Sequence, residues 1–205
     1  LGGDISPVFA VDPQVVTQTL LLFAVIYLLI LLNALRQIHL SNPVDLLRRA
    51  GEDVCTVSIM GRKEVTGSHK ITILADETIE EGEFDDGDML VLPGGMPGTL
   101  NLKEHEGLRN LIGEFDKKKK YLAAICAAPS ILSELGILKG RKACAYPSFE
   151  EGLDCAQVVH EAAVTDGHVT TGRGMGAAIP FALKLTELLC GTEKANEIAE
   201  SIVYA

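Results

Sequence analysis

The chain has 205 residues and a formal net charge of -10, from 18 Lys and Arg against 28 Asp and Glu. This length suits one domain with or without an appendage, and the negative charge excludes a generally basic protein that binds nucleic-acid phosphates. The composition is 47% hydrophobic and only 22% charged. The apolar excess lies mostly in residues 1–35, which carry just two charges, Asp4 and Asp12. We therefore separate an atypical N-terminal segment, residues 1–42, from a globular segment, residues 43–205.

The five cysteines are odd in number, widely spaced and without a C-x-x-C pair. They are Cys55, Cys126, Cys144, Cys155 and Cys190. This pattern predicts neither a disulfide framework nor a zinc site. It fits a reducing compartment, and we expect a cytoplasmic protein.

Residues 15–35 form a nearly unbroken apolar run that has two interpretations. Its length is close to the roughly 20 residues that a membrane-spanning helix needs. If the run inserts, Arg36 after it and Asp12 before it place the globular segment in the cytoplasm. The alternative is that residues 27–32 form a buried strand, displaced from the first position of a parallel sheet. Hydrophobic periodicity does not separate the two.

Beyond residue 42, short apolar runs alternate with amphipathic segments. We predict helices over residues 43–50, 106–115, 129–135, 177–189 and 192–202, and strands over residues 54–59, 70–75, 89–92, 121–125, 142–145, 156–159 and 169–171. The main strands are apolar on both faces, which indicates a parallel sheet covered by helices on both sides. The pattern predicts a doubly wound α/β domain, in which ligands bind beyond the carboxyl ends of the strands.

Cys126 directly follows the predicted strand at residues 121–125. The small residues Ala127 and Ala128 allow the chain to turn back, and Pro129 suits the first turn of a helix. A cysteine at such a turn projects above the sheet edge, as in a nucleophile elbow, and the helix N-terminus favours its thiolate. The alternative is a buried cysteine that only packs, which is common for this residue type.

Gly94 and Gly95 follow the predicted strand at residues 89–92. A Gly-Gly turn at a strand end can bring backbone N–H groups close to a bound carbonyl, as an oxyanion hole requires. Taken alone, a tight turn without a ligand is the favoured interpretation. The glycine-rich run at residues 172–176 lacks the spacing of a dinucleotide-binding loop and is also interpreted as a turn.

Four motifs occur in a specific order. They are PVDLLRRAG at 43–51, LVLPGGMPG at 90–98, AAICAAPSIL at 123–132 and TTGRGMGAA at 170–178. Together they resemble the ThiJ/PfpI superfamily, most closely its parkinsonism-associated protein deglycase branch. The resemblance covers residues 43–205, and residues 1–42 do not match. It implies a flavodoxin-like doubly wound parallel sheet in a three-layer, class I glutamine-amidotransferase-like sandwich, usually as a homodimer.

The resemblance also implies a site and an activity. Cys126 corresponds to the reactive thiol, and the backbone amides of Gly95 and Ala127 correspond to the anion pocket. The implied activities are glyoxalase-type conversion of methylglyoxal to lactate and deglycation of methylglyoxal adducts. Neither a metal nor an organic cofactor is implied, the substrate is a small aldehyde or a glycated molecule, and no nucleic acid is expected as a partner.

Three departures from the family pattern matter. Family members place a glutamate four residues before the proline that matches Pro43, and here that position is His39. The histidine of a Thr-His-Pro step in some members corresponds to Tyr146, so His39 and Tyr146 are accessory candidates. Ala127 stands where protease-like branches often place His or Gly, which argues against peptidase activity. One hypothesis is that residues 1–42 are a chimeric or mistranslated substitute for the family's N-terminus.

These observations leave competing functions. The first is a cofactor-free glyoxalase or deglycase in which the Cys126 thiolate attacks an aldehyde and backbone amides stabilise the oxyanion. The second is a non-enzymatic oxidative-stress sensor or chaperone, favoured by the missing glutamate, in which the thiol is oxidised to a sulfinic acid. The third is either function tethered to a membrane through residues 15–35.

Overall fold

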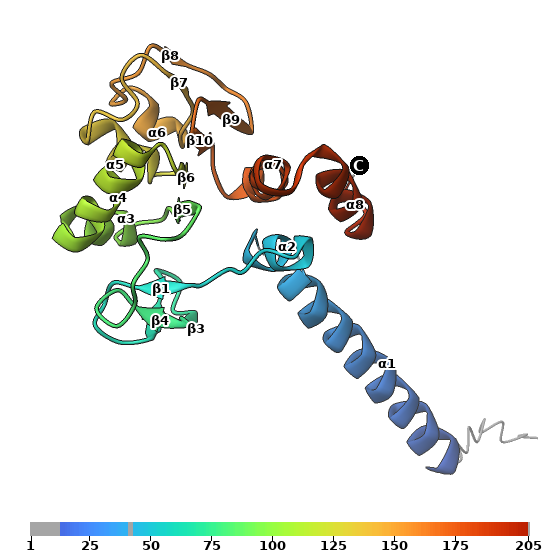
Figure 1. Ribbon diagram of the computed structural model, residues 1–205. Helices are drawn as coiled ribbons and strands as arrows, with labels where there is room; N and C mark the ends of the chain where they lie inside the picture. The colour runs from blue at the N-terminus through green and yellow to red at the C-terminus, as the bar shows by residue number, and fades with distance from the viewer. Residues whose placement is uncertain (1–12, 41–42, 205) are drawn as a thin grey trace, which may run out of the picture. The chain divides into compact units, whose positions relative to one another are not determined.

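The computed structural model describes residues 13–40 and 43–204, and for residues 13, 15 and 29–40 it describes the backbone alone. The chain divides into two compact units, residues 1–40 and residues 41–205. The first unit contains helix α1 (Pro13–Leu40), and the second contains the remaining helices and strands that are described (Figure 1).

Helix α1 is continuous over 28 residues. Residues 27–32 lie inside it, so the interpretation of this segment as a displaced first strand is wrong. The run is rich in leucine, which favours helix, and a helix forms its own backbone hydrogen bonds without a neighbouring strand. Its apolar side chains between residues 16 and 28 are exposed, for example Leu20 at 64%, Phe23 at 65% and Tyr27 at 70%. Within the described residues no helix is long and apolar enough to cross a membrane, so the membrane helix expected at residues 15–35 gains no support.

The second unit is built around a four-stranded sheet in the order β5-β6-β10-β9. The strands are β5 (Met89–Leu92), β6 (Tyr121–Ile125), β9 (Ala163–Asp166) and β10 (Val169–Gly172). β6 is parallel to both of its neighbours, and β5 has β6 as its one strand partner among the described residues. β9 is antiparallel to β10 because only Gly167 and His168 connect them, and Gly167 has the positive φ of 64° that tight hairpin turns favour. The prediction of an all-parallel sheet is therefore wrong for the β9–β10 pair.

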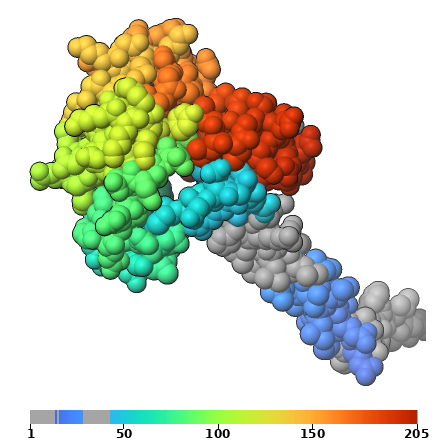
Figure 2. Space-filling model, viewed as in Figure 1, coloured from blue at the N-terminus to red at the C-terminus, as the bar shows by residue number. Residues whose placement is uncertain are grey.

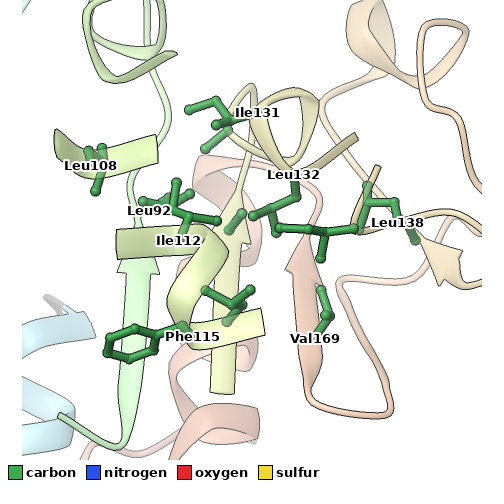
Figure 3. Close-up of a cluster of buried hydrophobic side chains, with 13 residues drawn as sticks. Leu92, Leu108, Ile112, Phe115, Ile131, Leu132, Leu138 and Val169 are labelled. Carbon is green, nitrogen blue, oxygen red and sulfur yellow. The ribbon is translucent and has the colours of Figure 1, made fainter. Parts of the chain in front are cut away.

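Helices cover both faces of this sheet, which confirms the predicted α/β class. On one face they are α3 (Gly98–Glu104), α4 (Glu106–Lys118) and α5 (Pro129–Glu134). Their apolar side chains form one buried cluster with the strands (Figure 3). Ile112, Ile131 and Leu132 are 0% exposed within it, and Phe115 is 2% exposed. Removing this apolar surface from water is the main source of the unit's stability.

The opposite face is covered by three other helices. They are α2 (Pro43–Ala50), α7 (Ala178–Cys190) and α8 (Thr192–Ser201). Phe181 of α7 is buried against Ala123 of β6. Leu46 of α2 is buried with Ala182 of α7 and Ile198 of α8, and the space-filling view shows α2 directly against the two C-terminal helices (Figure 2). The predicted bounds of α2, β5 and β6 agree with the structure.

Three two-stranded sheets are also present. They are the parallel pair β1 (Val57–Ser58) and β4 (Glu77–Thr78), the antiparallel hairpin β2 (Glu64–Thr66) and β3 (Thr72–Leu74), and the parallel pair β7 (Lys142–Ala143) and β8 (Gln157–Val158). The strand predicted at residues 70–75 therefore belongs to a separate hairpin instead of the main sheet. The sequence does not predict α3, the four-residue helix α6 (Pro147–Glu150) or the 3-10 helix η1 (Met175–Ala177).

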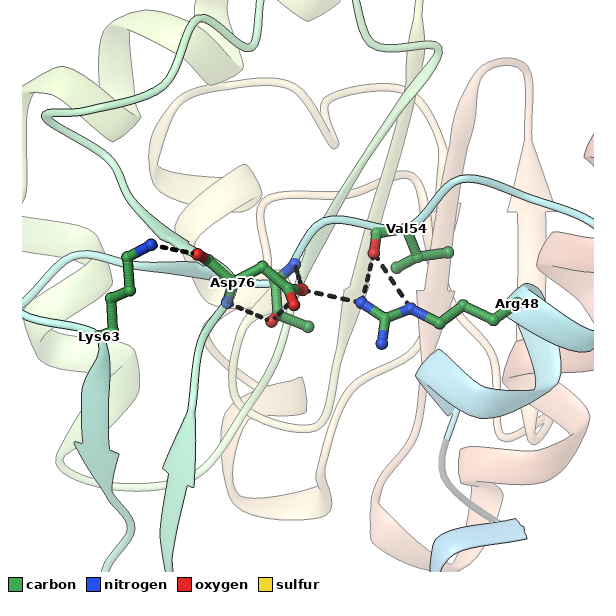
Figure 4. Close-up of polar contacts among 5 residues, drawn as sticks. Arg48, Val54, Lys63 and Asp76 are labelled. Carbon is green, nitrogen blue, oxygen red and sulfur yellow. Dashed lines mark hydrogen bonds and ion pairs between the residues drawn. The ribbon is translucent and has the colours of Figure 1, made fainter.

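Polar contacts around Asp76 connect the β1–β4 pair to α2 (Figure 4). Arg48 donates from Nη2 to Asp76 Oδ2 at 2.8 Å and to the Val54 carbonyl at 2.6 Å. The amide and hydroxyl of Thr56 donate to the same carboxylate oxygen at 2.8 and 2.7 Å. The hydrogen bonds from Thr56, and then the charge of Arg48, lower the pKa of Asp76. Lys63 Nζ also donates to the Asp76 carbonyl at 2.6 Å.

Candidate active site

Cys126 occupies a left-handed turn at the end of β6. Its φ is 67°, a conformation that non-glycine residues rarely adopt, and its side chain is half-buried. Two hydrogen bonds hold the turn: the Cys126 amide donates to the Gly172 carbonyl at 2.9 Å, and the Tyr146 amide donates to the Cys126 carbonyl at 2.8 Å. The structure therefore has the strained strand-to-helix elbow that the sequence predicts.

Gly94 makes a close approach to this elbow. A Cβ at Gly94 would lie 2.6 Å from the Cys126 Cβ, 2.6 Å from the Ile125 carbonyl oxygen and 3.1 Å from the Ala127 amide nitrogen. Two of these atoms belong to the backbone, so no side chain can be accommodated without moving the chain. Gly95 has a different requirement, because its φ of 96° suits glycine while the space around it is open.

The structure brings the predicted oxyanion donors to the same place. Ala127 directly follows Cys126 and is only 2% exposed. Gly95 directly follows Gly94, the residue that approaches the Ala127 amide nitrogen closely. Neither amide donates a hydrogen bond to another described residue. The hydroxyl and amide of Thr99 both donate to the Gly95 carbonyl at 2.8 Å and hold the loop in place. N–H groups that no described residue accepts from can stabilise a negatively charged oxygen.

The helix after the elbow is shorter than predicted. α5 covers Pro129–Glu134, six residues, with Pro129 in its first turn. The Ser130 hydroxyl donates to the Ala127 carbonyl at 2.7 Å and reinforces this first turn.

The two accessory candidates have different outcomes. The Tyr146 amide donates to the elbow, and the residue is 49% exposed. His39 falls in the part of α1 that is described by backbone alone, so its side chain lies outside the described residues.

The other cysteines have surroundings unlike those of Cys126. Cys144 is buried, its Sγ donates to the Thr171 carbonyl at 3.2 Å, and burial raises its pKa. Cys190 donates to Glu52 Oε1 at 2.8 Å, and burial together with this carboxylate raises the pKa of the thiol to about 11. Desolvation also raises the pKa of Cys55 and Cys155.

Sequence reasoning misses a charged group near the elbow. Arg173 follows Gly172, whose carbonyl binds the Cys126 amide. Its Nε donates to Glu150 Oε1 at 3.2 Å, and His160 Nδ1 lies 3.4 Å from the same oxygen. The Gly-Arg-Gly run that follows β10, the strand paired with β6, could have indicated this residue from the sequence. We interpreted that run as a simple turn.

The geometry at Cys126 first defines a class: α/β proteins with a cysteine on an elbow between a strand and a helix. Comparison with known proteins then gives the family. The DJ-1/PfpI family pattern matches residues 25–188, and the chain belongs to that family. This range begins before Pro43, where the resemblance of the motifs begins, and includes part of α1.

Individual relatives agree with this assignment. Protein DJ-1 homolog A of Arabidopsis thaliana is 37% identical over 163 residues, which cover 78% of this chain and 42% of that protein. Protein dj-1beta of Drosophila melanogaster is 34% identical over 180 residues, which cover 87% of this chain and 96% of that protein. The structure of oxidized Toxoplasma gondii DJ-1 is similar with a TM-score of 0.75 and 33% identity, covering 80% of this chain and 89% of that one. The chain thus spans less than half of the Arabidopsis relative and nearly all of the Drosophila one.

Proposed function

We propose that the chain is a cofactor-free, Cys126-dependent enzyme of the glyoxalase or deglycase type, acting on methylglyoxal or its adducts. The observation that carries the proposal is the elbow: a half-buried thiol on a left-handed turn, pressed against Gly94. The amides of Gly95 and Ala127, which donate to no residue in the part of the chain that the structure describes, support it, because an attacked carbonyl needs hydrogen-bond donors for its developing oxyanion.

The proposed reaction balances without an external oxidant or reductant. The Cys126 thiolate adds to the aldehyde carbon of methylglyoxal, which forms a C–S bond and an alkoxide bound by the two amides. The proton on that carbon is removed and a proton is returned to the former ketone carbon through an enediol, so that one carbon is oxidised and the other reduced. One water then hydrolyses the lactoyl thioester, which releases lactate and restores the thiol.

The test is lactate formation by the full chain and its Cys126→Ser variant. We expect the wild-type chain to form lactate from methylglyoxal and the variant to fall to the uncatalysed rate. Cys55→Ser is the matched control, because Cys55 is an exposed cysteine outside the elbow, and it should keep full activity. Equal turnover by wild type and Cys126→Ser would rule out the proposal.

A second candidate function is a thiol sensor of oxidative stress or a chaperone without turnover. It is favoured by the residue at position 39, a histidine where the family pattern has a glutamate. Here hydrogen peroxide oxidises the Cys126 thiolate stepwise to a sulfinic acid. Mass spectrometry after mild peroxide treatment, combined with a lack of aldehyde turnover in the untreated chain, would favour this function over the first.

The proposal extends to assembly, architecture and compartment. A homodimer is supported by the family and by Ile71, Ile73 and Leu74, which are 60–71% exposed at the β2–β3 hairpin, and sedimentation analysis tests it. The two helical layers around the sheet support a flavodoxin-like, class I glutamine-amidotransferase-like sandwich.

The compartment that we propose is the cytoplasm. It is supported by the five cysteines, which form no disulfide with one another.

A further inference from the structure

We infer that Arg173 is the carboxylate-binding residue of the Cys126 site, that Glu150 positions its guanidinium, and that small 2-hydroxy and 2-oxo carboxylates bind there. The choice of ligand rests on the proposed function, because the product of the proposed reaction carries a carboxylate on the carbon that was bonded to the thiol. The placement of Arg173 rests on the structure alone.

Strand register places Arg173 beside Cys126. β6 and β10 are parallel, with Ile125 paired to Gly172, and the next hydrogen bond runs from the Cys126 amide to the Gly172 carbonyl. Cys126 and Arg173 each directly follow the last paired residue of their strand, so they extend from adjacent positions on strands that are about 4.8 Å apart.

The alternation of side chains then gives the face. A Cβ at Gly172 would lie 2.7 Å from Phe181 and 3.0 Å from the side chain of Ile125, so the Gly172 position faces α7. Successive residues of a strand point to opposite faces. Arg173 is therefore directed to the face opposite α7, the face on which α5 leaves the elbow.

Glu150 holds the guanidinium from a second segment of the same site. It ends the short helix α6, which begins directly after Tyr146, and the Tyr146 amide donates to the Cys126 carbonyl. The Glu150 side chain is only 13% exposed, and its Oε1 accepts the hydrogen bond from Arg173 Nε. Arg173 and Glu150 thus each lie close in sequence to a residue that makes a backbone hydrogen bond with Cys126: Gly172 for Arg173 and Tyr146 for Glu150.

The terminal nitrogens of Arg173 are left for a ligand. Within the described part of the chain, Nε is the one guanidinium atom of Arg173 that donates a hydrogen bond, and the side chain is 38% exposed. Arg48, Arg109 and Arg141 each use a terminal nitrogen on a protein oxygen, whereas Arg49, like Arg173, donates from Nε alone to a carboxylate. A guanidinium with free terminal nitrogens matches the two oxygens of a carboxylate.

The first experiment measures binding without catalysis. Calorimetric titration of the full-length Cys126→Ser chain uses lactate and pyruvate as probes, with neutral lactamide as the control ligand. We expect both carboxylates to bind, lactamide to bind far more weakly, and Arg173→Met to weaken lactate binding by about tenfold or more, as the loss of a charge-assisted hydrogen-bond pair implies. Arg109→Met is the matched control, because Arg109 also pairs with a glutamate, Glu134, and it should leave lactate binding unchanged.

The second experiment locates the ligand beside the thiol and tests positioning by Glu150. In the wild-type chain, lactate should slow alkylation of Cys126 by iodoacetamide, whereas in Arg173→Met it should give no protection. Glu150→Gln should weaken lactate binding by a smaller factor, and adding it to Arg173→Met should cause no further loss, because it acts through Arg173.

The outcomes separate this inference from the proposed function. Unchanged lactate affinity in a folded Arg173→Met variant, or no binding and no protection by any carboxylate, overturns the inference. Arg173→Lys guards against misfolding, because it keeps the charge but lacks the planar donor pair and should bind with intermediate affinity. Arg173-dependent binding in a chain that forms no lactate supports this site while the proposed enzyme fails, and lactate formation with Arg173-independent binding gives the reverse result.

Discussion

The four-stranded sheet and the β1–β4 pair are stabilised in different ways. The sheet lies between two layers of helices, and its core includes Ile112 and Leu132 at 0% exposure. Ile59 and Ile79, directly after β1 and β4, are partly buried against the same cluster, but this pair is also held by Asp76, whose side chain is 46% exposed. The stability of the four-stranded sheet therefore depends on apolar burial, whereas the connection of β1–β4 to α2 depends on exposed charges that salt and pH can weaken.

The largest effect is expected when a core leucine is truncated. Leu132→Ala should lower the free energy of unfolding by about 3 kcal/mol, because it leaves a cavity in a closely packed cluster. The matched control is Met60→Ala just after β1, where the residue is 48% exposed, and its effect should stay well below that of Leu132→Ala. Urea unfolding followed by circular dichroism measures both, and equal losses would contradict the contrast between the regions.

A substitution at Gly94 should destabilise the chain less than Leu132→Ala does, but it should change the reactivity of the Cys126 thiol more. Gly94→Ala should cost about 1–3 kcal/mol, because the new methyl group meets the backbone oxygen of Ile125. It should also change the rate at which Cys126 is alkylated, since the elbow must move. Gly98→Ala is the control, because a Cβ there has no atom within 4 Å. A Gly94→Ala chain with wild-type stability and thiol reactivity would show that the contact is not tight.

The smallest effect is expected at Asp76, and it depends on pH. The folded state lowers the pKa of Asp76 from its ordinary value of 3.8, so its stabilisation is present above that value and is lost as pH falls through the folded-state pKa. Asp76→Asn should therefore cost under about 1 kcal/mol at neutral pH, because the carboxylate is exposed. The difference between wild type and variant should shrink in acid and in high salt. Thermal unfolding across pH measures it, and a difference that persists in strong acid would exclude the charged contacts as its origin.

Helices, strands and turns that depend on neighbouring residues could be predicted from the sequence. The bounds of α2, β5 and β6 follow from their apolar patterns and their flanking proline and glycine residues, and the Cys126 elbow follows from the Ala-Ala-Pro step after β6. The strand interpretation of residues 27–32 failed because a short apolar run has no periodicity that separates strand from helix.

The site was predicted less completely, because its remaining contacts join distant segments. Gly95 and Ala127 follow from the motifs, but the contact of Gly94 with Cys126 depends on the register of β5 against β6. The pairing of Arg173 with Glu150 joins positions 23 residues apart. Neither residue has a local pattern that distinguishes it from an ordinary surface charge.

The position of β6 inside the sheet has a consequence for substrate range. β6 carries the thiol and has a hydrogen-bonded strand on each side, whereas β5 carries the Gly95 loop and has one strand partner among the described residues. Local opening concentrates where fewer backbone hydrogen bonds resist it. Under the proposed function, we therefore expect small shifts of the Gly95 loop to accommodate carbonyl compounds of different size, while the Cys126 sulfur stays in place.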